Sequence, residues 1–383
     1  MLNWINFLHI YQPPTQDRET LKKVFEESYS QIPNLLDGYP KFKITLNITG
    51  TLLEKFQEKD FGNLLERINR YVSEGRIELV SSAFFHPILP LMPESEVRHQ
   101  IKLGLEKGKE IFGESYKPRG FFFPEMAYNK KVAEIVKEFG FDWIILDEMH
   151  LYPQKPNSSV RYEVKDVGLG VLFRDRKYSK GFPPELIVKN LDKIQEKYLI
   201  TAHDGEMYGY WHKDFQNFYK QAFDNEKINF LTVSEYLSEL DNNKETVEPI
   251  EANWESSVEE IKNNNPFALW NSPENIIQNQ LWIFFEAIYS IIQENQNDSN
   301  YSWAKKHFDR GTPSCFWWWA SNKKIDVFSP ISWNPTDIEK GLEEMVKSIR
   351  SLKKLQKSKR LEIEKKHADL LELIWGTHWD RQS

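Results

Sequence analysis

The sequence predicts an α/β fold in which a β/α barrel is followed by a helical C-terminal region. Over the first two-thirds of the 383 residues, short apolar runs alternate with amphipathic segments, which is typical of β/α units around a parallel sheet. From about Asn242, strand-like runs become rare and long helical patterns replace them. We therefore expect a barrel domain over residues 1–241 and a helical region over residues 242–383 that packs on the barrel and contributes to its cleft.

Eight short apolar runs are predicted to be strands. They are Trp4–Leu8, Phe42–Leu46, Ile77–Val80, Gly120–Phe123, Trp143–Leu146, Gly170–Phe173, Tyr198–Thr201 and Ile228–Leu231. Helical patterns lie between or after these runs. They are Leu21–Tyr29, Leu64–Val72, Ser95–Phe112, Lys130–Phe139, Asn275–Asn295 and Thr336–Ile374.

The composition describes a globular protein with an acidic balance. The formal net charge is −7 and the pI about 5.8, with no obvious basic face, so we expect no nucleic-acid partner. The one cysteine, Cys315, excludes an intramolecular disulfide and favours a reducing compartment. Met1–Pro14 lacks the basic segment of a signal peptide, and no run approaches the ~18–20 apolar residues of a membrane span. We expect a cytoplasmic protein without a membrane partner. The sequence does not indicate which oligomeric state the protein has.

Polar side chains gather just after the predicted strands. They are His9, Gln12, Ser81, Ser82, His86, Glu125, Asp147, Glu148, Arg174, Asp175, His203, Asp204 and Glu206. The C-terminal ends of the strands form the face on which β/α barrels build their active sites. We therefore expect the active site at this end of the barrel.

The segment Gly120–Glu125 gives the sharpest candidate for a catalytic group. An apolar strand delivers a single carboxylate to its tip, and Pro124 rigidifies the approach. A carboxylate held in this way can attack an anomeric carbon and form a glycosyl-enzyme ester. The alternative is a glutamate that only caps the following helix or pairs with an arginine.

The segment Thr201–Trp211 gives the second candidate. Asp204 and Glu206 flank a glycine directly after a strand, where a tight turn can direct both inward. A carboxyl in a pocket beside another acid has its pKa raised, which suits a general acid. The alternative is an Asp-Gly turn with exposed charges. Aromatic residues that can stack on a sugar favour the first interpretation; they are Tyr208, Tyr210 and Trp211.

The segment His9–Pro14 gives a third, weaker candidate at the end of the first strand. His9 and Gln12 could donate hydrogen bonds to substrate hydroxyls, although a histidine at a strand end is often satisfied within the fold. The 13 tryptophans suit a core as well as a sugar site. The candidates for sugar stacking are Trp211, Trp317, Trp318, Trp254 and Trp270, with core packing favoured for the last two.

Together these segments resemble the five short regions that mark glycoside hydrolase family 57. The first resembles His9–Pro13, with Tyr11 where many members carry a second histidine. The others resemble Gly75–Glu78 followed by Pro87–Pro90, Gly120–Glu125, Asp204–Glu206 and, least closely, Ser314–Ser321 with its three adjacent tryptophans. The third and fourth regions, in this order and spacing, are the specific part of the resemblance, which covers most of the chain.

The resemblance implies an incomplete, seven-stranded TIM-like barrel with a helical bundle, a retaining mechanism and no required metal or cofactor. It implies an oligo- or polysaccharide substrate with α-linked sugars, most of all α-1,4-glucan, and an enzyme of the α-amylase or 4-α-glucanotransferase type. Glu125 would be the nucleophile and Asp204 the acid/base, with their carboxyls ~5 to 5.5 Å apart. The residues expected to bind substrate are His9, Gln12, Glu78, His86, His203, Glu206, Trp211, Trp317 and Trp318.

Seven barrel strands are one fewer than the eight predicted runs. One run would then belong to a hairpin outside the barrel, and Arg161–Phe173 is the candidate because strand-like runs flank Gly168 and Gly170.

Three other functions stay open. The first is an α-galactosidase of the same family. The second is a metal-dependent polysaccharide hydrolase or deacetylase; no two of the nine histidines are spaced three to five residues apart, but His9, Asp147 and Asp204 could converge from separate strand ends. The third is a non-catalytic carbohydrate-binding protein, which the presence of both carboxylates disfavours. Hydrolase and transferase are not distinguished by the sequence.

Overall fold

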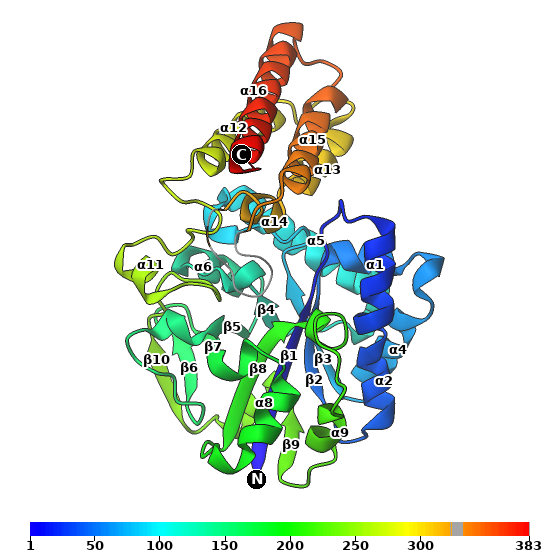
Figure 1. The fold of residues 1–383 in the computed structure, drawn as a ribbon, viewed down its shortest axis with the longest axis vertical. Helices are drawn as coiled ribbons and strands as arrows, with labels where there is room; N and C mark the ends of the chain where they lie inside the picture. The colour runs from blue at the N-terminus through cyan, green and yellow to red at the C-terminus, as the bar shows by residue number, and fades with distance from the viewer. Residues whose placement is uncertain (322, 324–331, 383) are drawn as a thin grey trace. The chain divides into compact units, whose positions relative to one another are not determined.

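The computed structural model describes residues 1–321, 323 and 332–382. In this part of the chain one sheet holds ten strands in the order β10-β6-β7-β5-β4-β3-β2-β1-β8, with β9 also paired to β1 (Figure 1). The strands are β1 Leu2–Ile10, β2 Ile44–Ile48, β3 Ile77–Ser82, β4 Gly120–Phe122, β5 Trp143–Asp147, β6 Arg161–Val164, β7 Leu169–Arg174, β8 Tyr198–Asp204, β9 Ile228–Leu231 and β10 Lys244–Val247.

All eight predicted strands are present, and the expected hairpin forms, but it does not lie outside the barrel because its second strand also pairs with β5 in the sheet. It consists of β6 and β7, which pair antiparallel, whereas the other paired strands run parallel. The sheet curls: Asp175 N–H, just after β7, donates to Ile200 O of β8 at 2.8 Å, although these strands lie far apart in the sheet order. The result is an incomplete TIM-like barrel. The expected count of seven strands is not confirmed, because β6, β9 and β10 also belong to the sheet.

The two faces of the sheet pack against separate cores. Successive strand residues point to opposite faces. On β1, Ile5 and Phe7 therefore join one apolar cluster, while Trp4 and Leu8 join the other. The first cluster collects residues from strands around the sheet and from α10 (Val233–Glu239), and we call its side the inner face. The second packs beneath the surrounding helices on the outer face.

Helices connect most of the strands, and several begin at side-chain caps. Thr232 and Glu235 form a capping box at the start of α10, which satisfies backbone N–H groups that have no partner inside the helix. The other helices of this unit are α1 Arg18–Val24, α2 Gln31–Gly38, α3 Gly50–Phe56, α4 Leu64–Ser73, α5 Glu94–Phe112, α6 Lys130–Glu138, α7 Arg176–Ser179, α8 Pro183–Asn190 and α9 Phe218–Phe223.

The described chain divides into two compact units. The sheet unit comprises residues 1–12, 16–84 and 89–258, and the helical unit comprises residues 13–15, 85–88 and the chain from residue 259 onward. The sheet unit extends past residue 241, where we placed its end, because β10 pairs with β6. The isolated, polar run of β10 gave no periodic signal strong enough to mark a strand.

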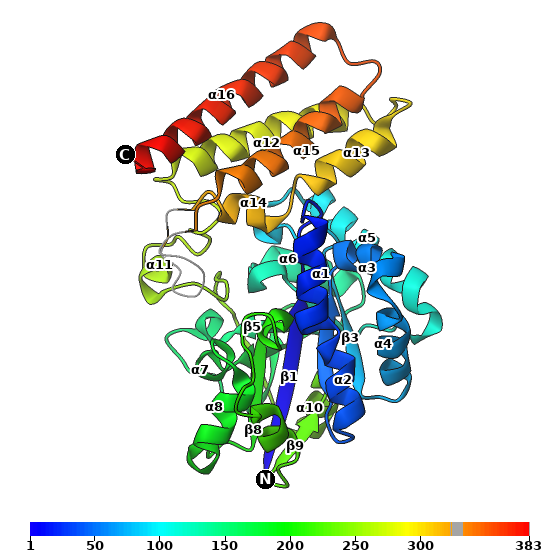
Figure 2. The same ribbon diagram turned by 45° about the vertical axis from the view of Figure 1, so that its right-hand side comes forward.

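The helical unit holds a bundle in which α12, α13, α15 and α16 run side by side (Figure 2). Its helices are α11 Val258–Lys262, α12 Ile276–Glu294, α13 Tyr301–Arg310, α14 Ser314–Trp318, α15 Pro335–Ser351 and α16 Lys357–Gln382. None of the helices in the described residues is long and apolar enough to cross a membrane.

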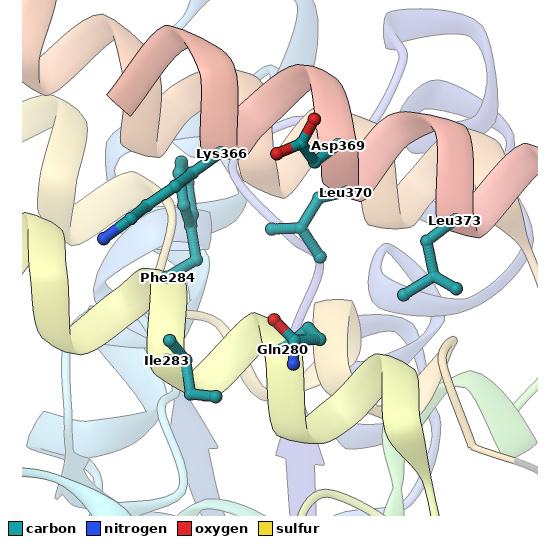
Figure 3. Close-up of a pocket in the computed structure, with 7 residues that line it drawn as sticks. All are labelled: Gln280, Ile283, Phe284, Lys366, Asp369, Leu370 and Leu373. Atoms are coloured by element: carbon teal, nitrogen blue, oxygen red, sulfur yellow. The ribbon is translucent and has the colours of Figure 1, made fainter. Parts of the chain in front are cut away.

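A cavity of about 280 Å³ lies between α12 and α16 (Figure 3). None of the predicted site residues lines it. Its lining residues are Gln280, Ile283, Phe284, Lys366, Asp369, Leu370 and Leu373.

Candidate active site

Polar side chains meet on the inner face where the parallel strands end. Four of them follow an inner-face core residue by two positions and so point to the same side of the sheet; they are His9, Asp147, Arg174 and Asp204. In the strand register His9 is paired with Asp204 on one side and Asn47 on the other, and Asp147 is paired with Arg174. The predicted gathering of ionisable groups at this edge is therefore present in the structure.

Glu125 enters this edge from the turn that follows β4. The turn covers Pro124–Met126, and Glu125 has a left-handed backbone with φ 60° and ψ 14°. A residue with a side chain adopts this conformation at a cost of about 1–3 kcal/mol, so its surroundings must hold it there. The cap of the following helix α6 is Asn129, so capping is not the role of Glu125.

Trp254 holds the Glu125 carboxylate. Its indole Nε1–H donates to Glu125 Oε2 at 2.8 Å, and its backbone N–H donates to Glu125 O at 3.1 Å. The Trp254 ring also lies edge-on to the His9 ring, with centroids 6.2 Å apart. Because His9 is the register neighbour of Asp204, this chain of contacts brings Glu125 and Asp204 to the same edge.

His9 is a buried, neutral histidine with a defined tautomer. Burial lowers its pKa to about 4, against the opposing effect of its hydrogen bond to Asn47. Asn47 Nδ2 donates to Val80 O at 2.9 Å, which leaves Asn47 Oδ1 to face His9 Nδ1 at 2.8 Å. Nδ1 therefore carries the proton, and Nε2 of the neutral ring is an acceptor. The expectation that His9 donates to a sugar hydroxyl changes accordingly: the ring can accept from one.

Asp204 has the electrostatic character of a general acid. Burial raises its pKa to about 7; the Arg174 cation opposes this shift and the Glu255 carboxylate adds to it. A carboxyl that keeps its proton near neutral pH can deliver it to a leaving oxygen. The alternative of an exposed Asp-Gly turn does not fit this burial.

Glu206 lies two residues further on and is 5% exposed. Its Oε1 accepts hydrogen bonds from Tyr29 OH and, at 3.0 Å, from Gln12 Nε2. Burial and the neighbouring Asp204 raise the pKa of Glu206 to about 8, so the two acids titrate as a pair. The intervening Gly205 is required by packing, because a Cβ there would lie 2.4 Å from Ile10 Cγ2.

Asp147 and Arg174 form a buried ion pair beside these acids. Arg174 Nε donates to Asp147 Oδ2 at 2.7 Å, and the two side chains are 4% and 0% exposed. Burial by itself would raise the pKa of Asp147, but Arg174 and Arg176 hold it below its usual value. The positions of Asp147 and Arg174 at strand ends indicated this edge, although neither was among the predicted site residues.

Two further residues at this edge were not predicted as site residues. No motif marks Asn47, which lies inside the second strand. Trp254 was considered only for stacking or core packing, and its segment fell in the region expected to be helical. Trp254 and Glu125 are 129 residues apart in the sequence, so no local pattern can reveal their contact.

Two predicted substrate-binding residues lie elsewhere. Glu78 is at the amino-terminal end of β3, where its carboxylate accepts hydrogen bonds from Ser234 N at 2.9 Å and from Ser234 Oγ at the start of α10. The amino ends of parallel strands lie at the edge opposite the site. His203 precedes Asp204 and so points to the outer face, where its ring stacks on Tyr208 at 5.3 Å.

Trp211 remains in the sheet unit, and three other candidates belong to the helical unit. Trp211 is 46% exposed, in the loop that follows Glu206. In the helical unit His86 Nδ1 lies 3.0 Å from Ser314 Oγ. Trp317 is 2% exposed and stacks on Trp282, which leaves no open ring face for a sugar. Trp318 packs edge-on against Trp319 at 4.4 Å.

Among the described residues, no group of three or more His, Cys, Asp or Glu side chains could hold a metal ion.

A carboxyl with a raised pKa and a second carboxylate held by a hydrogen bond lie at the carboxyl edge of an incomplete β/α barrel, a combination that glycoside-cleaving enzymes use. The chain belongs to glycosyl hydrolase family 57, whose family model matches residues 3–252. The resemblance drawn from the sequence is thereby confirmed.

Curated relatives of known name are similar over part of their length. An α-amylase of Pyrococcus horikoshii is 26% identical over 260 residues, which is 62% of this chain and 40% of the relative. A 4-α-glucanotransferase of Thermococcus litoralis is 24% identical over 260 residues, which is 62% of this chain and 39% of the relative. The chain spans about two-fifths of the length of these relatives.

Solved structures show the same fold. The 4-α-glucanotransferase of Thermococcus litoralis superposes with a TM-score of 0.72 at 20% identity, over 92% of this chain and 60% of that one. A GH57-type branching enzyme of Pyrococcus horikoshii superposes with a TM-score of 0.72 at 15% identity, over 96% of this chain and 94% of that one.

Proposed function

We propose that this protein cleaves or transfers α-1,4-linked glucan by a retaining mechanism, as an enzyme of the α-amylase or 4-α-glucanotransferase type. The observation that carries the proposal is the unequal pair of carboxyls: Glu125 is held by a hydrogen-bond donor, whereas the pKa of Asp204 is raised to about 7. Retaining enzymes need one ionised nucleophile and one protonated acid. The names of the family relatives support α-glucan as the substrate.

In the first step Asp204 donates its proton to the glycosidic oxygen while Glu125 attacks the anomeric carbon. The C–O bond to the leaving sugar breaks, and an ester forms between Glu125 and the remaining sugar. In the second step ionised Asp204 takes a proton from water or from an acceptor hydroxyl, whose oxygen displaces Glu125. Water gives hydrolysis and a sugar hydroxyl gives transfer. The expected carboxyl separation of ~5 to 5.5 Å stays a prediction.

The neighbouring groups have supporting roles in this proposal. The neutral His9 ring presents an acceptor to a sugar hydroxyl, and the exposed Trp211 ring offers a stacking surface on the loop after Glu206. Gln12 and Glu206 hydrogen-bond to each other, so they shape the wall of the site beside Asp204.

The test is product analysis with maltooligosaccharides, soluble starch and an aryl α-galactoside, resolved by chromatography. Shorter products alone indicate a hydrolase, and both longer and shorter products a 4-α-glucanotransferase. We expect Glu125→Gln to lower turnover by at least ~10³-fold. Glu134→Gln, the same change on the exposed face of α6, should have no effect. Release of galactose alone, or equal activity of Glu125→Gln and wild type, would overturn the proposal.

A further inference from the structure

The Trp254 side chain touches the proposed nucleophile in a way that stacking or core packing does not require. Two hydrogen bonds from one residue, through the indole and through the backbone, engage the Glu125 carboxylate and carbonyl at 2.8 and 3.1 Å. Glu125 and Met126 both have positive φ angles, 60° and 51°. Consecutive left-handed residues with side chains persist only where outside contacts hold them. Trp254 supplies such contacts directly at Glu125.

Trp254 is itself fixed by two arginines that share one buried carboxylate. Asp147 is fully buried and pairs with Arg174 Nε at 2.7 Å and with Arg176 Nε at 3.0 Å. Both guanidinium groups then converge on Trp254 O, from Arg174 Nη2 at 3.2 Å and from Arg176 Nη2 at 2.8 Å. Arg176 Nη1 also donates to Ser256 O at 2.8 Å. We call Asp147, Arg174 and Arg176 the arginine clamp.

The arginine clamp also reaches the strand that carries the proposed acid. Arg174 Nη1 donates to Ala202 O, two residues before Asp204, at 2.7 Å, and the Arg174 guanidinium lies 5.2 Å from the Trp254 ring centroid. One arginine thus touches both the β8 backbone and the residue that holds Glu125. A bidentate, planar guanidinium suits this function because its donors point in fixed directions.

We propose that Trp254 is a positioning residue for the nucleophile Glu125 and that the arginine clamp sets the position of Trp254. This inference rests on the proposed function, because it assigns Glu125 the attack on the anomeric carbon. The indole N–H orients the carboxylate. The arginine clamp fixes the position of Trp254, and so of that N–H, relative to β5, β7 and β8. Arg176 contributes through Trp254 and not through contact with substrate.

The test isolates the step that Glu125 performs. The probe is 5-fluoro-α-D-glucopyranosyl fluoride, whose fluoride leaves without a proton from Asp204 and whose ester with Glu125 hydrolyses slowly. The measured quantities are the maximal labelling rate and the half-saturating probe concentration, with mass spectrometry to locate the label. The variants are Trp254→Phe, which removes the indole N–H donor and keeps a smaller aromatic ring, Arg176→Met, and the double variant.

We expect Trp254→Phe to lower the maximal labelling rate by about 10- to 100-fold, because misplacing a reacting group costs rates of this order. The half-saturating concentration should stay within about threefold, since no substrate contact is lost. Trp143→Phe is the matched control: Trp143 is buried in the same unit, and its Nε1 has no hydrogen-bond partner among the described residues. It should label at the wild-type rate even though its melting temperature falls.

The double variant tests whether the clamp acts through Trp254. If it does, Arg176→Met alone lowers the labelling rate, but the same substitution lowers the rate little further when Trp254→Phe is already present. Effects that multiply in full would overturn the role of the clamp, and labelling of Trp254→Phe at the wild-type rate would overturn the role of Trp254. If wild type is not labelled and converts no glucan, the proposed function fails and takes this inference with it.

Discussion

His9 and Asp204 lie side by side in the register of β1 and β8, so an uncharged imidazole flanks the proposed acid. The histidine pKa is lowered to about 4 and the aspartate pKa is raised to about 7, both chiefly by burial. Near neutral pH neither group therefore needs to carry a charge. Burial, without a neighbouring histidine cation to oppose it, is the main cause of the raised pKa of Asp204.

The role of Asp204 as proton donor predicts a loss that depends on the leaving group. Asp204→Asn should lower the rate on maltooligosaccharides by about 10²- to 10⁴-fold, the range of general acid catalysis. On an α-glucosyl fluoride, which needs no proton to leave, the loss of the first step should be much smaller. Steady-state rates on both substrates provide the measurement, with the exposed Asp192→Asn as control. Equal losses on the two substrates would rule out the acid role.

The charge of Glu255 predicts a shift in the pH profile. Glu255 raises the pKa of Asp204, and the reaction needs Asp204 protonated, so activity should fall as the pH rises through about 7. Glu255→Gln removes the like charge, lowers that pKa and should move the alkaline limb of kcat down by ~0.5 pH unit. The exposed Glu245→Gln should leave the limb in place. A limb that moves upward in Glu255→Gln would contradict the assignment.

The buried Glu206 predicts a stability difference that grows with pH. Its pKa rises from 4.5 to about 8 on folding, so the folded state keeps a proton that the unfolded state releases. Wild type should therefore lose stability as the pH rises from about 4.5 to 8. Glu206→Gln keeps an acceptor for Tyr29 and removes this loss. Its melting temperature relative to wild type should increase between pH 5 and pH 8.5, by the equivalent of at least ~1 kcal/mol.

One result would contradict the raised pKa of Glu206. If the difference between Glu206→Gln and wild type is the same at both pH values, the carboxyl is ionised in the folded protein. The hydrogen bonds from Tyr29 and Gln12 would then be made to a carboxylate.

The position of Glu78 predicts a structural and not a kinetic role. Its carboxylate binds the N-terminus of α10 at the edge opposite the site. Glu78→Gln weakens that interaction and should lower stability by about 1 kcal/mol. KM should change less than about twofold. Thermal melting and steady-state kinetics measure both effects, and a tenfold rise in KM at unchanged stability would restore Glu78 to the substrate site.

Sequence reasoning located the strands and placed Glu125 and Asp204 at their carboxyl edge, because both inferences depend on local patterns. Glu125 and Asp204 each follow an apolar run, and the carboxyl ends of parallel strands form one edge. The same reasoning assigned both of the adjacent residues His203 and Asp204 to the site, although they point to opposite faces of the sheet. The face that a residue occupies depends on the register of its strand, and a shift by one position exchanges the two faces.

The residues that were missed depend on contacts between distant segments. Glu78, by contrast, was expected to bind substrate, but it lies at the amino-terminal end of its strand, which a motif match does not reveal. Asp147 and Arg174 act through an ion pair across two strands and through the backbone of a third segment. That third segment, around Trp254, has no regular secondary structure, so no periodicity marks it.

The most direct test of the central claim is the anomeric configuration of the first product. Wild-type enzyme is mixed with a maltooligosaccharide in deuterated buffer, and proton NMR follows the anomeric signals before mutarotation. Two successive displacements, at Glu125 and then by water or a hydroxyl, predict that the α anomer appears first. A β anomer appearing first would contradict the retaining mechanism and the role of Glu125 as a covalent nucleophile.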